Sequence, residues 1–150
     1  MKMPIEPLKF MSRMGKFYEW LYPLPALGEP MVRAINRGIA RMNFYGPLLR
    51  LKRHDSVDGF KKQFLRLIEM MQLPIEIIAE SEGPNGFEFY VHSCPYGYHR
   101  PDQQGVCDAA MDMDRVLFKL MGADLTILEA AVQGAPRCRV AFSMAGRERA

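Results

Sequence analysis

The chain has 150 residues, of which 49% are hydrophobic and 25% charged, with a formal net charge of +3. These values are typical of one ordinary globular domain, and the mild charge, without any DNA- or RNA-binding motif, does not indicate nucleic-acid binding. No apolar run approaches the roughly 18 residues of a membrane-spanning helix, and the N-terminal stretch lacks the features of a signal peptide. We therefore expect a cytoplasmic protein whose three cysteines are structural, metal-binding or catalytic, because disulfide frameworks are rare in that compartment.

The first 55 residues predict a helical arm followed by a basic helix. The arm contains a short helix from about Ser12 to Leu21, which ends before Pro23. The second helix is expected from Pro30 to Tyr45, because proline suits a first helical turn. Basic residues step along one face of this helix: Arg33, Arg37 and Arg41. Such a helix can lie on an anionic membrane or bind acidic ligands, although a solvated basic face is the commoner explanation.

The clearest helix is predicted from Val57 to Gln72. Asp55 or Ser56 can cap its start by accepting a backbone N–H, and Pro74 closes it. Its apolar residues recur every three and four positions, the period of a helical stripe that faces a core: Val57, Phe60, Phe64, Leu67, Ile68 and Met71. We expect this helix to form part of the core.

The following residues change to the period of β-strands. Strand-like runs at residues 75–80 and 86–93 flank a turn rich in Gly, Pro and Asn. A helix is expected over 106–121, and a second hairpin over 124–133 and 138–144. N-terminal helices followed by a ββαββ order predict an α+β fold with a four-stranded antiparallel sheet. We expect a single domain over 1–150, with the arm and basic helix in 1–55 and the α+β core in 56–150.

All three cysteines, Cys94, Cys107 and Cys138, fall in this core. Cys94 ends the second predicted strand and Cys138 begins the fourth, so antiparallel strands would bring both to one edge of the sheet. The loop after Cys94 must lead to the helix that carries Cys107 in its first turn. We therefore expect the three sulfurs to lie within roughly 4–7 Å of one another, as thiolates that share one metal ion or cluster must.

Three thiolates suit zinc or an iron–sulfur cluster, both of which favour sulfur ligands. The metal ligands would be the three cysteines, and the fourth position would stay open for substrate or be filled by one of four side chains: His92, His99, Asp108 or Glu129. The spacing of the cysteines matches none of the compact zinc motifs.

A metal-free alternative uses Cys107 as a nucleophile. The N-terminus of a helix lowers the pKa of a cysteine, and nearby arginines would add positive potential: Arg100, Arg137 and Arg139. Asp108 or a histidine such as His99 would then carry the proton. Cysteines are also common as small buried hydrophobes, and aspartates in a first helical turn commonly complement the helix dipole, which applies here to Asp108, Asp112 and Asp114.

Three short motifs in this region resemble the L-2-amino-thiazoline-4-carboxylate hydrolase family: Cys94-Pro95-Tyr96, Cys107-Asp108, and the run from Gly134 to Cys138. The resemblance covers roughly Ile75 to Ser143 and implies an enzyme that opens a cyclic sulfur heterocycle by hydrolysis. Glu129, Gly134 and Cys138 are also similar, more remotely, to a run in the four-vinyl-reductase domain, a small-molecule-binding domain found in sensors and in tetrapyrrole metabolism. The chain departs from the family after Cys138, where Arg-Val-Ala-Phe replaces the more typical acidic residue and aromatics.

Two functions are therefore expected. The first is a hydrolase-like enzyme for a small sulfur- or nitrogen-containing molecule, with Cys107, Asp108 and His99 as catalytic residues. The second is a non-catalytic binding or sensing module, in which the cysteines fix the edge of an apolar pocket between the sheet and the helix at 57–72. The sequence does not indicate an oligomeric state.

Overall fold

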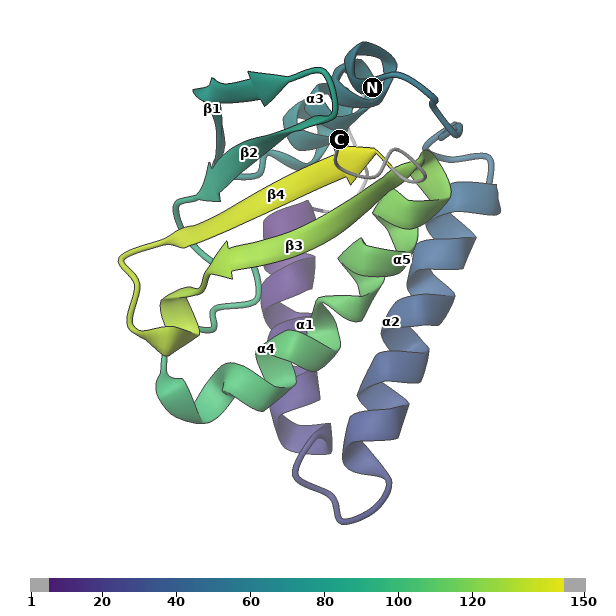
Figure 1. Ribbon diagram of the computed structural model, residues 1–150. Coiled ribbons are helices and arrows are strands. Elements are labelled where there is room, and N and C mark those ends of the chain that lie inside the picture. The colour runs from purple at the N-terminus through teal and green to yellow at the C-terminus, as the bar shows by residue number, and fades with distance from the viewer. Residues whose placement is uncertain (1–5, 145–150) are drawn as a thin grey trace.

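The computed structural model describes residues 6–144, in which helices pack against one four-stranded antiparallel sheet (Figure 1). The α+β class and the antiparallel sheet are thus confirmed. The helices are α1 (Pro7–Leu21), α2 (Gly28–Tyr45), α3 (Val57–Met71), α4 (Gln104–Ala110) and α5 (Asp112–Met121). The strands are β1 (Ile75–Gly83), β2 (Gly86–Val91), β3 (Ala123–Glu129) and β4 (Cys138–Met144).

The spatial order of the strands is β1-β2-β4-β3, so the expected ββαββ order is not the order of strands across the sheet. After β2, the crossover through α4 and α5 leads to β3, which lies at the edge of the sheet and leaves the position next to β2 for β4. The last strand, β4, then returns between β2 and β3, antiparallel to both. The sheet therefore has β2 and β4 at its centre and one hairpin strand at each edge (Figure 1).

The helix expected over 106–121 is two helices that meet at Met111. Met111 ends α4 and precedes α5, and Figure 1 shows the chain changing direction there. The prediction of one continuous helix is wrong: both halves pack against α2, but α4 also contacts α1, whereas α5 also contacts β3. The bend also sets Asp112, the first residue of α5, against the arginines of α2.

The start of α3 agrees with the predicted cap. The Ser56 hydroxyl accepts a hydrogen bond from the backbone N–H of Gly59 at 3.2 Å, which satisfies one of the free donors of the first turn. The helix ends at Gln72, which adopts a left-handed conformation and stops it just before Pro74.

The main core lies between α3, α5 and the inner face of the sheet. Phe60 and Phe64 of α3 meet Phe142 of β4 with ring centroids 4.9 and 5.0 Å apart. Phe87 and Phe89 alternate with half-buried residues along β2, so the strand presents one apolar face inward, as its pattern predicts. Edge-to-face and tilted ring contacts of this kind add to the free energy gained from burial.

The basic face of α2 is partly buried in contacts with α4 and α5. The Asp112 carboxylate accepts hydrogen bonds from Arg33 at 3.0 Å, from Arg37 at 3.0 Å and from Arg115 at 3.1 Å. Arg33 also pairs with Asp108 at 2.8 Å. Arg33 is therefore partly buried against acidic residues of the crossover helices, whereas Arg37 pairs with Asp112 and stays exposed, as expected for a solvated face.

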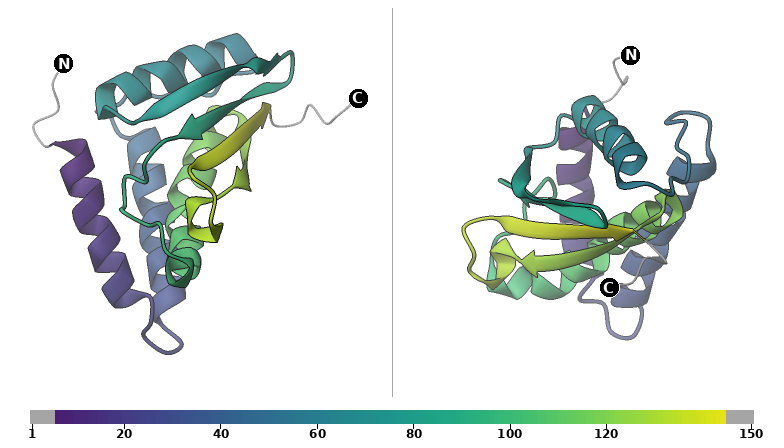
Figure 2. Two further views of the ribbon diagram at one scale, coloured as in Figure 1. Left: turned by 90° about the vertical axis from the view of Figure 1, so that its left-hand side faces the viewer. Right: turned by 45° about the horizontal axis from the view of Figure 1, so that its top comes forward.

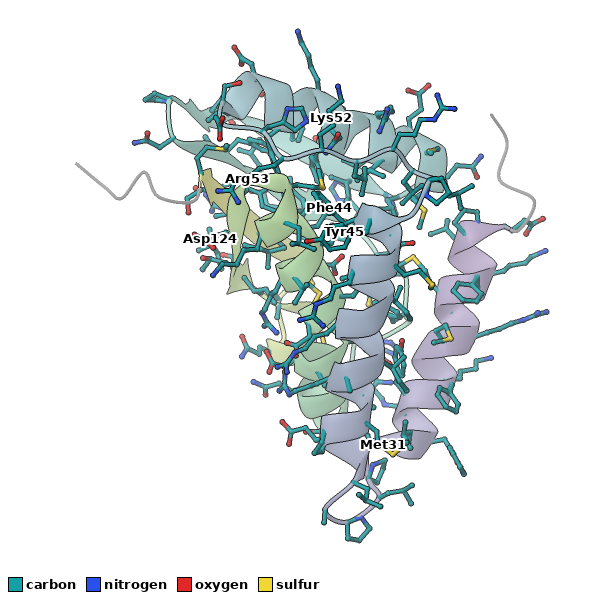
Figure 3. All side chains as sticks on the ribbon, turned by 90° about the vertical axis from the view of Figure 1, so that its right-hand side faces the viewer. Met31, Phe44, Tyr45, Lys52, Arg53 and Asp124 are labelled. Carbon is teal, nitrogen blue, oxygen red and sulfur yellow. The ribbon has the colours of Figure 1, made fainter. Side chains whose placement is uncertain are left out.

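The helices α1 and α2 run antiparallel, and the loop that joins them projects away from the sheet (Figures 1 and 2). Met31 lies at the loop end of α2, whereas Phe44 and Tyr45 lie at the opposite end, next to the segment that carries Lys52 and Arg53 (Figure 3). Within residues 6–144, no helix combines the length and the apolar character needed to cross a membrane.

Candidate functional site

An apolar cavity of about 120 Å³ lies between the sheet and the helices. All four strands contribute to its walls, as do α1, α3, α4 and α5. It is situated where the main core meets a second cluster that is centred on α1, α4 and the loop after β2. The second cluster includes Tyr96, which lines the cavity and is buried. A hollow of this kind, between two packed clusters, is a common place for a small ligand.

All three cysteines line this cavity. Val91, the last residue of β2, pairs with Cys138, the first residue of β4, and Cys94 follows three residues after Val91. Cys107 arrives from the first turn of α4. The sheet edge, the loop and the helix start thus place three residues that lie far apart in the sequence on the lining of one cavity, and the sulfur separations of roughly 4–7 Å stay a prediction.

The cavity surroundings raise the pKa of two of the thiols, Cys94 and Cys107. Burial, with smaller contributions from the neighbouring Cys94 and Cys138, raises the pKa of Cys107 to about 12. Burial also raises the pKa of Cys94, although backbone N–H groups of the following loop act in the opposite direction. The mutual influence of the three thiols indicates that they lie near one another. The helix start therefore does not produce the thiolate that the sequence suggested for Cys107, because loss of water outweighs the helix dipole.

A metal centre at the three cysteines stays a prediction. Among residues 6–144, no group of three or more His, Cys, Asp or Glu side chains has the geometry to hold a metal ion. The Cys138 sulfur accepts a hydrogen bond from the backbone N–H of Ala131 at 3.4 Å.

Asp108 lies outside the cavity, although it is next to Cys107 in the sequence. Its half-exposed carboxylate pairs with Arg33 at 2.8 Å and with Arg115 at 2.6 Å. The hydrogen bond from Arg33, with further help from Arg115, lowers the pKa of Asp108 below its usual value. A carboxylate held in this way is a poor proton carrier near neutral pH.

His92, His99 and Glu129 are exposed and are not among the described residues that line the cavity. His99 Nδ1 lies 3.1 Å from the Gly97 carbonyl oxygen, and His92 Nε2 lies 3.0 Å from the Glu76 carboxylate. The three arginines expected near the thiols have other partners: Arg100 pairs with Asp102 and Glu19, Arg137 stacks over the ring of Tyr90, and Arg139 pairs with Glu88.

Asp114 is the ionisable residue that the sequence interpretation passed over. It is half-buried on α5 and is the one Asp or Glu among the described residues that line the cavity. Burial raises the pKa of Asp114 to about 7, and Arg115 only partly opposes this effect. The charge of Asp114 also raises the pKa of Tyr96, which indicates that the two side chains are close.

A signal for Asp114 exists in the sequence. Met111, Asp114 and Phe118 are spaced three and four residues apart and all line the cavity, so the helical period assigns Asp114 to the same face as two apolar residues. A carboxylate on the buried face of a helix is unusual and is a better indicator of function than proximity to a cysteine along the chain. The chain matches no protein-family model and no curated protein.

Proposed function

We propose that the protein binds a small, largely apolar molecule in the cavity, with Asp114 as the polar contact that orients it. The observation that carries this proposal is the combination of apolar walls with one carboxyl whose pKa is raised to about 7. A cavity of about 120 Å³ is comparable to the engineered cavities of about 150 Å³ that bind benzene. The ligand is therefore of the size of one ring with a polar atom.

Asp114 can recognise such a ligand in two ways. In its neutral form, which dominates below about pH 7, the carboxyl donates a hydrogen bond to a carbonyl oxygen or a ring nitrogen. A weakly basic ligand would instead take the proton and leave an ion pair in surroundings of low polarity, where such contacts are strong. The aromatic rings of Phe89 and Phe118 and the polarisable sulfurs would contact the rest of the molecule.

The test is a thermal-shift screen against small rings that carry a carbonyl, an amine or a sulfur atom, followed by calorimetry on the compounds that stabilise the protein. A ligand at about 100 times its Kd stabilises by about 2.7 kcal/mol. Asp114→Asn should weaken binding of basic ligands at least about ten-fold, whereas Asp124→Asn, at an exposed aspartate of β3, should leave it unchanged.

Ile127→Phe is designed to fill the cavity, because Ile127 lies on its wall. This variant should lose the ligand response while it keeps the circular dichroism spectrum of the parent. Binding that survives in this folded variant would contradict the proposal, as would a screen in which no compound of the class stabilises the protein.

A second candidate is a hydrolase that opens a small sulfur- or nitrogen-containing ring. It is favoured by the presence of three thiols and a carboxyl with a pKa of about 7 on the lining of one cavity, and by the likeness of Cys94-Pro95-Tyr96 and Cys107-Asp108 to the thiazoline-carboxylate hydrolase motifs. A pKa near the working pH suits general acid–base catalysis. In this version Asp114, rather than Asp108 or His99, accepts a proton from the attacking water or Cys107 thiol and returns it to the leaving sulfur or nitrogen.

Hydrolysis of 2-amino-thiazoline-4-carboxylate, followed by chromatography, tests the second candidate. Asp114→Asn and Cys107→Ser should each abolish turnover if a thiol attacks, and mass spectrometry should detect a covalent adduct on Cys107. Elemental analysis of protein purified without oxygen provides a separate measurement, because iron or zinc bound in stoichiometric amounts would support the metal-dependent version. Ligand binding without any turnover would leave binding as the function.

A further inference from the structure

The outer face of α1 and the adjoining loop carry an unusual number of exposed apolar side chains. Trp20 is 68% exposed, Leu27 is 63% exposed and Phe10 is 48% exposed. We call the full set the hairpin surface: Phe10, Phe17, Trp20, Leu24, Leu27 and Met31. Figure 2 shows that the loop between α1 and α2 is the most projecting part of the molecule, and Figure 3 places Met31 beside it.

The fold of the chain does not account for this surface. The opposite face of α1 already supplies the core contacts, with Tyr18 and Leu21 fully or almost fully buried. Gly15, on the same inner face, lies so close to the carbonyl oxygen of Tyr96 that a methyl group there would clash. Because α1 packs on the protein through its inner face, the rings of Phe17 and Trp20 stay exposed on its outer face. They stack on each other with centroids 6.1 Å apart.

Positive charge accompanies the exposed rings. Arg13, Lys16 and Trp20 are spaced three and four residues apart, so they share one face of α1. Within residues 6–144, neither Arg13 nor Lys16 has a carboxylate at ion-pair distance, whereas Lys9 pairs with Glu6. The other acidic residues nearby are paired with arginines: Glu19 with Arg100 and Glu29 with Arg33.

We propose that the hairpin surface docks on an anionic lipid membrane. Tryptophan and phenylalanine beside lysine and arginine are characteristic of helices that lie in the membrane interface, where rings enter the boundary of the acyl chains and cations meet lipid phosphates. The charge of Arg13 and Lys16 is complementary to such a surface. Leu24 and Leu27, which are 43% and 63% exposed in the loop that follows α1, extend the apolar part of this surface.

This surface differs from the basic face of α2. Arg33 and Arg37 form ion pairs with the buried Asp112, whereas Arg13 and Lys16 are exposed on the solvent side of α1. The proposal does not depend on what occupies the cavity. It predicts a shallow, salt-sensitive attachment, in which α1 lies along the membrane plane and the sheet stays in the water.

The chain provides its own probe, because Trp20 is its single tryptophan. The experiment compares vesicles of phosphatidylcholine with vesicles of phosphatidylcholine mixed with phosphatidylglycerol, and it measures co-sedimentation and the emission wavelength of Trp20. The expected result is sedimentation with the anionic vesicles only, a shift of the emission to shorter wavelength, and loss of both as salt is raised.

Arg13→Gln with Lys16→Gln should lower the partition coefficient by about 30-fold, because each basic residue near an anionic surface contributes roughly five-fold. The matched control is Arg53→Gln with Lys62→Gln, which removes the same charge at exposed residues outside the hairpin surface and should keep most of the binding. Leu27→Asp removes the apolar contact at the exposed loop and should also weaken sedimentation.

Equal loss in the test and control variants would overturn the proposal, because it would reduce the attraction to net charge. An unshifted Trp20 emission in the vesicle-bound state would do the same. If ultracentrifugation without lipid shows a dimer that Trp20→Ser dissociates, the occupant of the hairpin surface is a second copy of the chain, and the membrane proposal fails.

Discussion

Val91 of β2 pairs directly with Cys138 of β4. This register fixes the position of the thiols, because Cys94 emerges from β2 just beyond the pair and the loop that it begins leads to Cys107. A shift of one residue between β2 and β4 would turn the side chain of Cys138 to the other face of the sheet. The cavity chemistry therefore depends on strand register as much as on the identity of the three cysteines.

The stability of the ligand-free protein should depend on the ionisation of Asp114. Burial raises the pKa of Asp114 to about 7, above the value of about 3.9 in an unfolded chain. Between these values the folded state binds more protons, so this contribution to stability is complete below about pH 4 and is lost as the pH rises through about 7. Asp114→Asn should therefore gain roughly 2–4 kcal/mol at about pH 8, as measured by urea unfolding.

The control for this experiment is Asp124→Asn, at an exposed position, which should change stability by less than about 0.5 kcal/mol at any pH. The difference between parent and Asp114→Asn should shrink towards zero near pH 4, where both side chains are neutral. A loss of stability in Asp114→Asn at about pH 8 would show that the charged carboxylate has a favourable partner in the folded protein.

The cavity thiols should react slowly with iodoacetamide at neutral pH. Burial raises the pKa of Cys107 to about 12, and only the thiolate reacts. The alkylation rate of a variant that retains Cys107 as its single cysteine should rise about ten-fold per pH unit up to at least about pH 9. Mass spectrometry at timed intervals measures it, with the unfolded protein in urea as a reference for an accessible thiol. A rate that levels off near neutral pH would identify Cys107 as an activated nucleophile.

Removal of the Asp112 carboxylate should weaken the packing of α2 against α5 and lower the free energy of unfolding. Asp112 is 6% exposed and accepts hydrogen bonds from Arg33, Arg37 and Arg115. Asp112→Ala leaves these cations facing one another, and it should cost roughly 2–3 kcal/mol, at the lower end for a broken buried pair because the guanidinium groups keep some contact with water. Chemical denaturation measures the loss.

Asp108→Ala is the informative comparison, because Asp108 pairs with two of the same arginines, Arg33 and Arg115, but is half-exposed. It should cost less than about 1 kcal/mol. If the two variants lose the same amount, burial of Asp112 does not decide the strength of the network.

Gly15→Ala should separate α1 from the loop after β2. An added methyl group at Gly15 would collide with the Tyr96 carbonyl oxygen, and the Tyr98 hydroxyl donates a hydrogen bond to the Gly15 carbonyl oxygen at 2.8 Å. Gly38→Ala is a matched control, since Gly38 is also within a helix but nothing lies within 4 Å of the new group. We expect Gly38→Ala to gain about 0.5–1 kcal/mol from reduced backbone entropy and Gly15→Ala to lose about 1–3 kcal/mol by overpacking. If thermal unfolding shows that both variants gain stability, the loop after β2 can move to accommodate the added methyl group at Gly15.

The local sequence pattern was sufficient to predict those helices and strands whose buried face depends only on residues within the same element. The stripe of α3 is regular, and Ser56 caps it as expected, because capping and helical period involve only near neighbours. The same holds for Phe87 and Phe89, which alternate with more polar residues and face inward. Cys94 and Cys138 lie at one edge of the sheet because β4 pairs antiparallel with β2, a pairing that the sequence left open.

The tertiary structure decided which of the three aspartates faces the cavity, although the helical spacing of Met111, Asp114 and Phe118 already carried a signal for Asp114. The bend at Met111 turns Asp108 and Asp112 towards the arginines of α2 and leaves Asp114 on the cavity wall. Asp108 looked the better candidate because it adjoins Cys107, but neighbours along a helix point in different directions. The pKa of a carboxyl depends on the water and the charges around it. These surroundings are supplied by α2 and by the sheet, which are distant in the sequence. The helices and strands are therefore determined by local sequence, whereas the ionisation of the site residues is determined by how those elements pack.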